Sequence, residues 1–224
     1  MSIDAAVSRI QQILQLQQQL LDPSAATAVS SPAASSAAAS SAASSTGTFA
    51  GALASAQSAA GATSVAGSGY VNPLANASVR GERIDQGVDY AGSGTVGAIG
   101  PGVVTKVVQS GSGWEGGGYV EYKLTSGPYA GHSVYYAEGV TPTVSVGQTL
   151  SAGQPVATII SGFPTGMELG FAAGNGSEES YANVYGGGYT EGSPTAAGKA
   201  FSDLVASLGG PAGTLSGSVT GTFQ

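Results

Sequence analysis

Four acidic residues carry most of the chemistry that this sequence could perform. Asp85 and Asp89 lie four residues apart in GERIDQGVDYAG, residues 81–92, while Glu138 follows a Tyr-rich apolar run and Glu168 lies in GMELGFA, residues 166–172. Carboxyl groups that face one another across a groove can share protons, bind a hard cation, hydrogen-bond sugar hydroxyls, or serve as the acid and base of a glycosidase. Solvated carboxylates at strand ends are the simpler interpretation, with Asp85 and Asp89 capping turns. We favour that interpretation, or a binding role, over catalysis.

Trp114 is the strongest candidate for a binding residue among the aromatic side chains. It lies in SGSGWEGGGY, residues 110–119, where the surrounding glycines offer few side chains to bury it. An exposed ring of this kind stacks on a sugar face or anchors a protein partner. The tyrosines of the following segments alternate with polar residues, so we expect about half of them to belong to the core.

The segment from residue 70 to residue 173 has the pattern of a compact antiparallel β domain. Short runs rich in Val, Ile, Tyr and Thr are separated by turns that contain Gly. They predict strands over 87–90, 95–98, 102–110, 119–124, 132–138, 155–160 and 167–171. A helix should follow, with Ser193 as its N-cap, Pro194 in its first turn, an apolar face of Phe201, Leu204, Val205 and Leu208, and Gly209 as its end.

The remaining segments differ in composition from this domain. Residues 1–22 carry an apolar heptad stripe, which predicts a helix that either packs on its own chain or mediates oligomerisation and docking. Residues 23–69 are rich in Ala and Ser and predict a disordered linker. We place the β domain with its C-terminal helix at residues 70–210 and expect a flexible tail at residues 211–224.

Composition excludes several classes of partner. The formal net charge is −7 and only 8% of the residues are charged, which argues against nucleic acid and anionic membranes as partners. No apolar run is long enough to span a bilayer, and the N-terminus lacks the pattern of a secretory signal peptide. With no cysteine, thiolate metal sites are not available.

Three segments of the β domain together resemble the lysostaphin-type zinc endopeptidases of peptidoglycan. These are DQGVDYAGSGTVGAIGPGVVTKV, VYYAEGVTPTVSVGQTLSAGQPVATI and GMELGFA, within residues 80–173. The resemblance implies a duplicated β-hybrid motif, and hence a mainly β, sandwich-like antiparallel domain. It also implies that Asp85, Asp89, Glu138 and Glu168 converge in one groove.

The resemblance implies a zinc site that has lost its ligands. Asp85 replaces the first histidine of that family, Asp89 is kept, Glu138 and Glu168 replace further histidines, and Gly170 stands where another ligand is needed. Catalytic zinc requires three protein ligands and an open position for water, and the only histidine, His132, falls at none of these positions. We therefore expect no bound metal and no cofactor.

Three functions follow from this sequence. The favoured one is a non-catalytic binding or assembly module on a bacterial cell-wall, appendage or phage structure, with a cell-wall polymer or a structural protein as partner. The second is a cell-wall hydrolase that uses the acidic groove, with Glu168 and Glu138 as candidate catalytic residues, and the third is a structural component of a secreted appendage. Each implies a location outside the cell or in its envelope, reached without a signal peptide, or within a phage particle.

Overall fold

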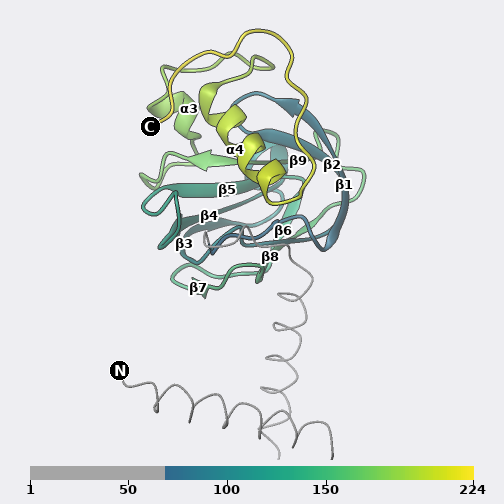
Figure 1. Ribbon diagram of the computed structural model, residues 1–224. Coiled ribbons are helices and arrows are strands. Elements are labelled where there is room, and N and C mark those ends of the chain that lie inside the picture. The colour runs from purple at the N-terminus through teal and green to yellow at the C-terminus, as the bar shows by residue number, and fades with distance from the viewer. Residues whose placement is uncertain (1–68) are drawn as a thin grey trace, which may run out of the picture. The chain divides into compact units, whose positions relative to one another are not determined.

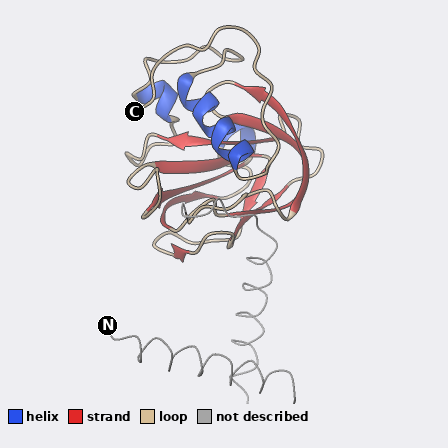
Figure 2. Cartoon of the chain, viewed as in Figure 1, coloured by secondary structure: helices blue, strands red, loops and turns tan. Residues whose placement is uncertain are grey.

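A single curled, mainly antiparallel β-sheet with a C-terminal helix makes up the described part of the chain (Figures 1 and 2). The computed structural model describes residues 69–224. The predicted fold class, mainly antiparallel β with a C-terminal helix, is confirmed for these residues. The helix predicted over residues 1–22 and the linker predicted over residues 23–69 lie outside the described residues, except for residue 69.

Nine strands form the sheet, in the spatial order β6-β8-β2-β9-β5-β4-β3-β7, with β1 paired to β2 beside this path. Their bounds are β1 Ala77–Ile84, β2 Val88–Gly97, β3 Gly102–Val108, β4 Gly118–Leu124, β5 Ser133–Glu138, β6 Val140–Pro142, β7 Thr149–Leu150, β8 Pro155–Ile159 and β9 Met167–Ala172. A single turn of 3₁₀ helix, η2 (Trp114–Gly116), precedes β4. The central strands β2, β9, β5 and β4 carry the candidate site.

The strand predictions are right in the centre of the sheet and incomplete at its edges. The strands predicted over 87–90 and 95–98 are one strand, β2, which passes through Gly92 and Gly94 at positive φ. Glycine adopts that conformation without strain, so the strand continues where its apolar pattern stops. The strands β1, β6 and β7 were not predicted, because β1 is charged and partly exposed and the other two span three and two residues.

The two faces of the sheet bury different sets of side chains. Along β5, Val134 and Tyr136 enter the main core, whereas Tyr135 and Ala137 enter a smaller cluster with Tyr119. Alternate residues of a strand point to opposite faces, which explains this division. The buried tyrosines exceed the expected half, since Tyr90, Tyr119, Tyr122, Tyr135 and Tyr136 are all fully buried.

Helix α4 (Ala196–Ser207) closes the main core and packs against β9 and β2. Its predicted apolar face is confirmed, because Phe201, Leu204, Val205 and Leu208 all belong to that core. The predicted start is corrected: Thr195, not Ser193, is the N-cap, and its hydroxyl accepts a hydrogen bond from the Gly198 N–H at 3.0 Å. A short helix, α3 (Tyr181–Val184), which the sequence pattern did not predict, precedes it and contacts both α4 and β9.

Residues 211–224 run back along the domain, in contrast to the flexible tail expected there. Thr214 pairs with Arg83 of β1 in a parallel bridge, and the Thr214 carbonyl accepts a hydrogen bond from the Ile84 N–H at 3.1 Å. Phe223 stacks on Phe171 with ring centroids 4.4 Å apart and also contacts Tyr181. The Gly- and Ser-rich composition suggested mobility, but one aromatic ring and a few backbone bonds hold the segment.

Candidate functional site

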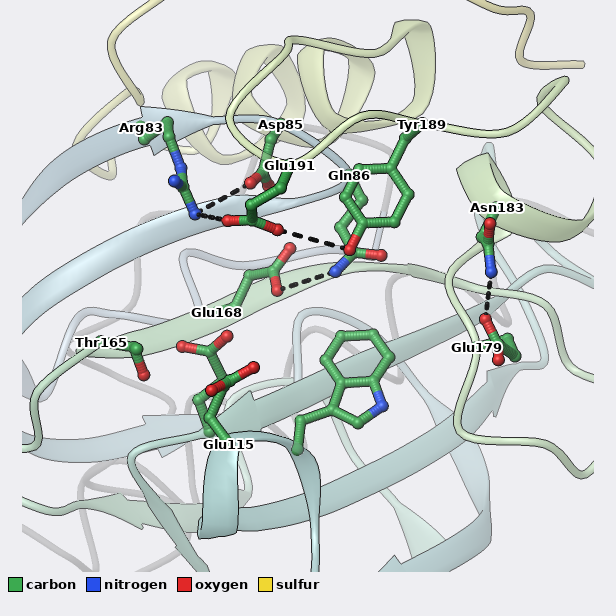
Figure 3. A pocket seen from close by; sticks show the side chains of 12 residues that line it. Arg83, Asp85, Gln86, Glu115, Thr165, Glu168, Glu179, Asn183, Tyr189 and Glu191 are labelled. Carbon is green, nitrogen blue, oxygen red and sulfur yellow. Dashed lines mark hydrogen bonds and ion pairs between the residues drawn. The ribbon is translucent and has the colours of Figure 1, made fainter.

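An acidic cleft of about 500 Å³ lies at one end of the central strands, beside the loop that precedes β4 and the segment that follows α3 (Figure 3). Six carboxyl groups and one guanidinium line it, together with Trp114 and four other polar or aromatic side chains. The lining residues are Arg83, Asp85, Gln86, Trp114, Glu115, Glu138, Thr165, Glu168, Glu179, Asn183, Tyr189 and Glu191. The cleft thus contains Asp85, Glu138, Glu168 and Trp114, and Asp89 lies directly beside it.

The register of the sheet brings three of the predicted carboxyl groups together. Asp89 of β2 and Glu168 of β9 are direct cross-strand partners, so their side chains leave the same face of the sheet. Asp85 follows the end of β1, and one carboxylate oxygen from each of the three residues lies within 4.8 Å of the others. All three residues are buried.

Arg83 holds two of these carboxylates and was not among the predicted site residues. Its Nη2 lies 3.0 Å from Asp85 Oδ2 and 2.6 Å from Glu191 Oε1, while its Nε donates to Asp89 Oδ2 at 3.0 Å. Arg83 and Asp85 are two residues apart, a spacing that puts side chains on one side of an extended chain, and that spacing was the available signal. Glu191, from a distant loop, carried no such signal.

Tyr135 fills the space beside Gly170. The Tyr135 hydroxyl donates a hydrogen bond to Glu168 Oε1 at 2.7 Å, in a fully buried position. A Cβ atom at Gly170 would lie 2.6 Å from that hydroxyl oxygen, and one at Gly87 would lie 2.4 Å from it. Real Cβ atoms do not come so close, so the tyrosine ring and a side chain at residue 170 cannot coexist in this arrangement.

Glu138 enters the cleft through an unusual backbone conformation. Its φ is +66°, in the left-handed region that costs a residue with a Cβ on the order of 1 kcal/mol. The residue is 9% exposed, and its Oε2 atom has no hydrogen-bond partner among the described residues. Backbone strain and an unpartnered buried oxygen at one residue are features of ligand-binding positions.

Burial raises the pKa of every predicted carboxyl group in this site. Desolvation, together with the neighbouring charge of Asp85, raises the pKa of Asp89 to about 7, although Arg83 opposes this shift. Desolvation and the nearby Glu115 raise the pKa of Glu138 to about 7, against a hydrogen bond with Thr165. Burial and the charge of Asp85 raise the pKa of Glu168 well above its ordinary value, and burial raises that of Asp85 despite Arg83.

The N-terminal turn of helix α4 fixes the position of the Asp85 backbone. The Thr195 N–H and hydroxyl both donate to the Asp85 carbonyl, at 2.9 and 2.7 Å. Gly198 lies so close to the Asp85–Gly87 backbone that a Cβ there would be 2.3 Å from the Asp85 carbonyl oxygen. The N-terminal turn of α4 and the acidic loop are therefore packed backbone to backbone.

Trp114 forms one wall of the cleft. Its ring meets that of Tyr135 edge to face, with centroids 4.9 Å apart, and lies 5.5 Å from that of Tyr119. The residue is half-buried rather than fully exposed on its glycine-rich loop, since these two rings support it. Glu115, the next residue, is exposed and lines the same cleft.

His132 does not line the acidic cleft. Its ring packs among Tyr129, Phe171, Tyr181 and Phe223, with centroid distances of 5.3 to 6.1 Å. The prediction that this histidine takes no part in the acidic site agrees with that placement. Its aromatic surroundings indicate a packing role.

The donor set of the cleft suits a hard cation better than zinc. Asp85, Asp89 and Glu168 offer only oxygen ligands, which Ca²⁺ and Mg²⁺ prefer, whereas zinc sites are usually built with histidine or cysteine. Arg83 already forms ion pairs with both Asp85 and Asp89 and offsets part of their charge. Within the described residues, an internal guanidinium therefore offsets part of the charge that a bound cation would otherwise balance.

Within residues 69–224, no helix is long and apolar enough to cross a membrane. No family model, curated protein or solved structure matches the chain.

Proposed function

We propose that this protein is a non-catalytic binding or assembly module whose β domain resembles a lysostaphin-type peptidase that has lost its metal ligands. It binds or assembles on a bacterial cell-wall, appendage or phage structure, and the contact is made by the acidic cleft and by Trp114 in its wall. Its location is outside the cell, in the envelope or in a phage particle, and its partner is a cell-wall polymer or a structural protein of the assembly.

The position of Tyr135 is the observation that supports this proposal most directly. In the family that the sequence resembles, the position of Gly170 needs a metal ligand, and here the Tyr135 hydroxyl lies where any side chain at that position would begin. The hydroxyl instead donates to Glu168, which faces Asp89 across the strands. The Tyr135 hydroxyl thus occupies the space that a third metal ligand would need. Its hydrogen bond to Glu168 satisfies both buried polar groups, so the pair is stable without a metal.

A cell-wall hydrolase with an acidic groove is the alternative, and one observation favours it. Asp89 and Glu138 both have a pKa near 7, which suits a general acid or base at neutral pH. Arg83, however, is bonded to Asp89, and Glu168 is bonded to Tyr135 and fully buried. The two most central carboxyl groups are therefore engaged in structural bonds.

The proposal predicts that the purified full-length protein binds its target without turnover and holds no stoichiometric zinc. Incubation with purified peptidoglycan sacculi should release no soluble muropeptide or glycan fragment, and elemental analysis after dialysis should find less than one zinc per chain. Trp114→Ala should weaken co-sedimentation with sacculi, or with the isolated appendage or phage particle, by about 1 to 3 kcal/mol, the scale of a lost aromatic anchor.

Glu168→Gln separates the binding module from the hydrolase. An amide keeps the acceptor for Tyr135 but cannot transfer a proton, so fragment release by the wild type that disappears in this variant would establish the hydrolase. If the wild type does not co-sediment with sacculi, with the isolated appendage or with the phage particle, the binding function is contradicted.

A further inference from the structure

The six carboxyl groups of the acidic cleft are not equally engaged. Arg83 bonds to Asp85 and Glu191, Tyr135 and Gln86 bond to Glu168, and the Asn183 amide donates to Glu179. Glu115 is exposed, and Glu138 Oε2 has no hydrogen-bond partner among the described residues. The available acceptors therefore lie at Glu115 and Glu138.

Both residues line the cleft, and Glu138 pairs across the strands with Gly118, three residues after Glu115. Figure 3 shows Glu115 and Thr165 opposite the loop of Asp85, Glu191 and Tyr189, with Glu168 between the two sides. Glu115 and Glu138 are close enough for the charge of one to affect the other, and Thr165 hydrogen-bonds to the Glu138 carboxyl. Trp114, adjacent in sequence to Glu115, supplies an aromatic wall of the same cleft.

We propose that the acidic cleft binds a primary ammonium group carried by a peptide, with Glu115 and Glu138 as its carboxylate partners and Trp114 as its aromatic contact. This proposal rests on the binding function proposed above and names the chemical class of the ligand. An ammonium group supplies hydrogen-bond donors and a positive charge, which are what an unpartnered buried carboxylate oxygen lacks. A tryptophan face adds cation–π attraction.

Charge distinguishes this ligand from the other classes. Arg83 is the only basic side chain among the described residues that line the cleft, against six acidic ones, so an anionic ligand would be repelled. A neutral sugar would leave the excess charge uncompensated. A lysine-type ammonium also suits Glu138 better than a guanidinium does. The planar guanidinium pairs best with both oxygens of a carboxylate, whereas Glu138 offers only one oxygen without a partner among the described residues.

The size of the cleft suits a side chain rather than a polymer strand. Its volume of about 500 Å³ falls in the range that holds one small molecule or one long side chain with part of its backbone. The exposed Glu115 and the half-buried Trp114 leave its mouth open to a peptide. A lysine-type side chain can place its ammonium at Glu138 while its methylene stem contacts the indole.

The single tryptophan of the chain gives a direct assay. The full-length protein is titrated with the peptide acetyl-Gly-Lys-Gly-amide while Trp114 fluorescence is recorded, and the same titration is run with Nε-acetyl-lysine, norleucine or arginine in place of lysine. The lysine peptide should bind at least about tenfold more tightly than the acetylated and norleucine peptides, since both lack the charge. Equal affinity for lysine and Nε-acetyl-lysine would overturn the proposal, and tighter binding of arginine would replace ammonium by guanidinium.

Two variants and a matched control locate the site. Glu138→Gln and Glu115→Gln should each weaken binding of the lysine peptide by about tenfold, whereas Asp203→Asn should not. Asp203 is an exposed carboxylate of α4 paired with Lys199, away from the cleft, so its loss changes the net charge equally. Because Glu115 is exposed, its variant should fold like the wild type, and unchanged affinity in Glu115→Gln would contradict the proposal.

Competition separates this proposal from the binding function beneath it. If the protein co-sediments with sacculi or particles through Trp114, and the lysine peptide neither quenches Trp114 nor competes, the ammonium ligand is wrong and the binding function stands. If nothing co-sediments, the binding function itself fails.

Discussion

Tyr135 and Glu138 determine the character of the acidic cleft at the scale of single residues. Tyr135 occupies space that only glycine at residues 87 and 170 leaves open, and its hydroxyl satisfies Glu168. Glu138, in contrast, keeps one buried oxygen without a partner and a left-handed backbone. The polar group of Tyr135 is thus satisfied within the cleft, whereas Glu138 keeps an acceptor without a partner among the described residues.

Glu138 should make the protein less stable as the pH rises. Its carboxyl pKa is 4.5 when unfolded and about 7 when folded, so its stabilising contribution is complete below pH 4.5 and is lost as the pH rises through 7. Glu138→Gln removes this loss, so the variant should gain up to about 3 kcal/mol relative to wild type between pH 4.5 and pH 8.

Urea denaturation of both proteins at pH 4.5, 6 and 8 measures this difference. Asp85, Asp89 and Glu168 also have raised pKa values, and they act in the same direction in both proteins. Asp203→Asn is the control, because its stability should run parallel to that of the wild type. Parallel curves for Glu138→Gln would mean that Glu138 is ionised in the folded protein.

At the scale of elements, the junction of helix α4 with the loop after β1 positions the site. Thr195 both caps the helix and holds the Asp85 carbonyl, and Gly198 allows the two backbones to touch. A helix that packs on the core through Phe201 and Val205 thereby fixes an acidic side chain about a hundred residues earlier in the chain.

Thr195→Val should destabilise the protein by about 1 to 2 kcal/mol, since it removes an N-cap and one buried hydrogen bond while keeping the shape of the side chain. Thr195→Ser keeps the hydroxyl and should lose much less. Chemical denaturation of the two variants measures the difference. A larger loss in Thr195→Ser than in Thr195→Val would show that the methyl group, rather than the hydroxyl, matters at this junction.

Prediction from sequence succeeded where side-chain alternation and helical spacing were strong. The strands that contain Tyr119, Val134 and Leu169 are apolar on their buried faces, and the apolar face of α4 was clear. The register of β2 against β9 then brings Asp89 to Glu168 without any local signal. Convergence of the four carboxyl groups was expected only from the resemblance.

Other parts of the site depend on contacts between residues far apart in the sequence. Arg83 meets Glu191 across more than a hundred residues, and Tyr135 reaches Glu168 across the β5–β9 pair. Neither contact leaves a periodic pattern in the chain. The sequence predicted Ser193 as the N-cap of α4, whereas the structure has Thr195. Both residue types cap helices well, and only the hydrogen bonds of Thr195 to Asp85 decide between them.

At the scale of the whole molecule, the buried hydrophobic residues of the described core all lie within residues 70–208, with Phe223 packed against them. Its first buried residue is Tyr70 and its last is Leu208, and all the strands lie between them. Residues 23–69 are rich in Ala and Ser, which bury little apolar area.

A chain that begins at residue 69 should therefore unfold cooperatively at the same thermal midpoint as the full-length protein, within about 2 °C, and show the same β signature by circular dichroism. Any self-association of the full-length protein should disappear when residues 1–22 are removed, because the heptad stripe lies there. Sedimentation of both proteins tests this. A broad transition in the shortened chain would move the domain boundary toward the N-terminus.

The C-terminal segment also protects the edge of the sheet. Strand β1 pairs with β2 on one side, and on its other side Thr214 bonds to the backbone of Glu82 and Ile84. An uncovered strand edge is a template on which a second chain can add a strand, and proteins use covering segments to prevent this. Gly81 allows the Ala212 carbonyl to approach where a Cβ would lie only 2.0 Å away. The segment around Thr214 thus occupies the outer edge of β1 at residues 82–84, where a second chain could otherwise pair edge to edge.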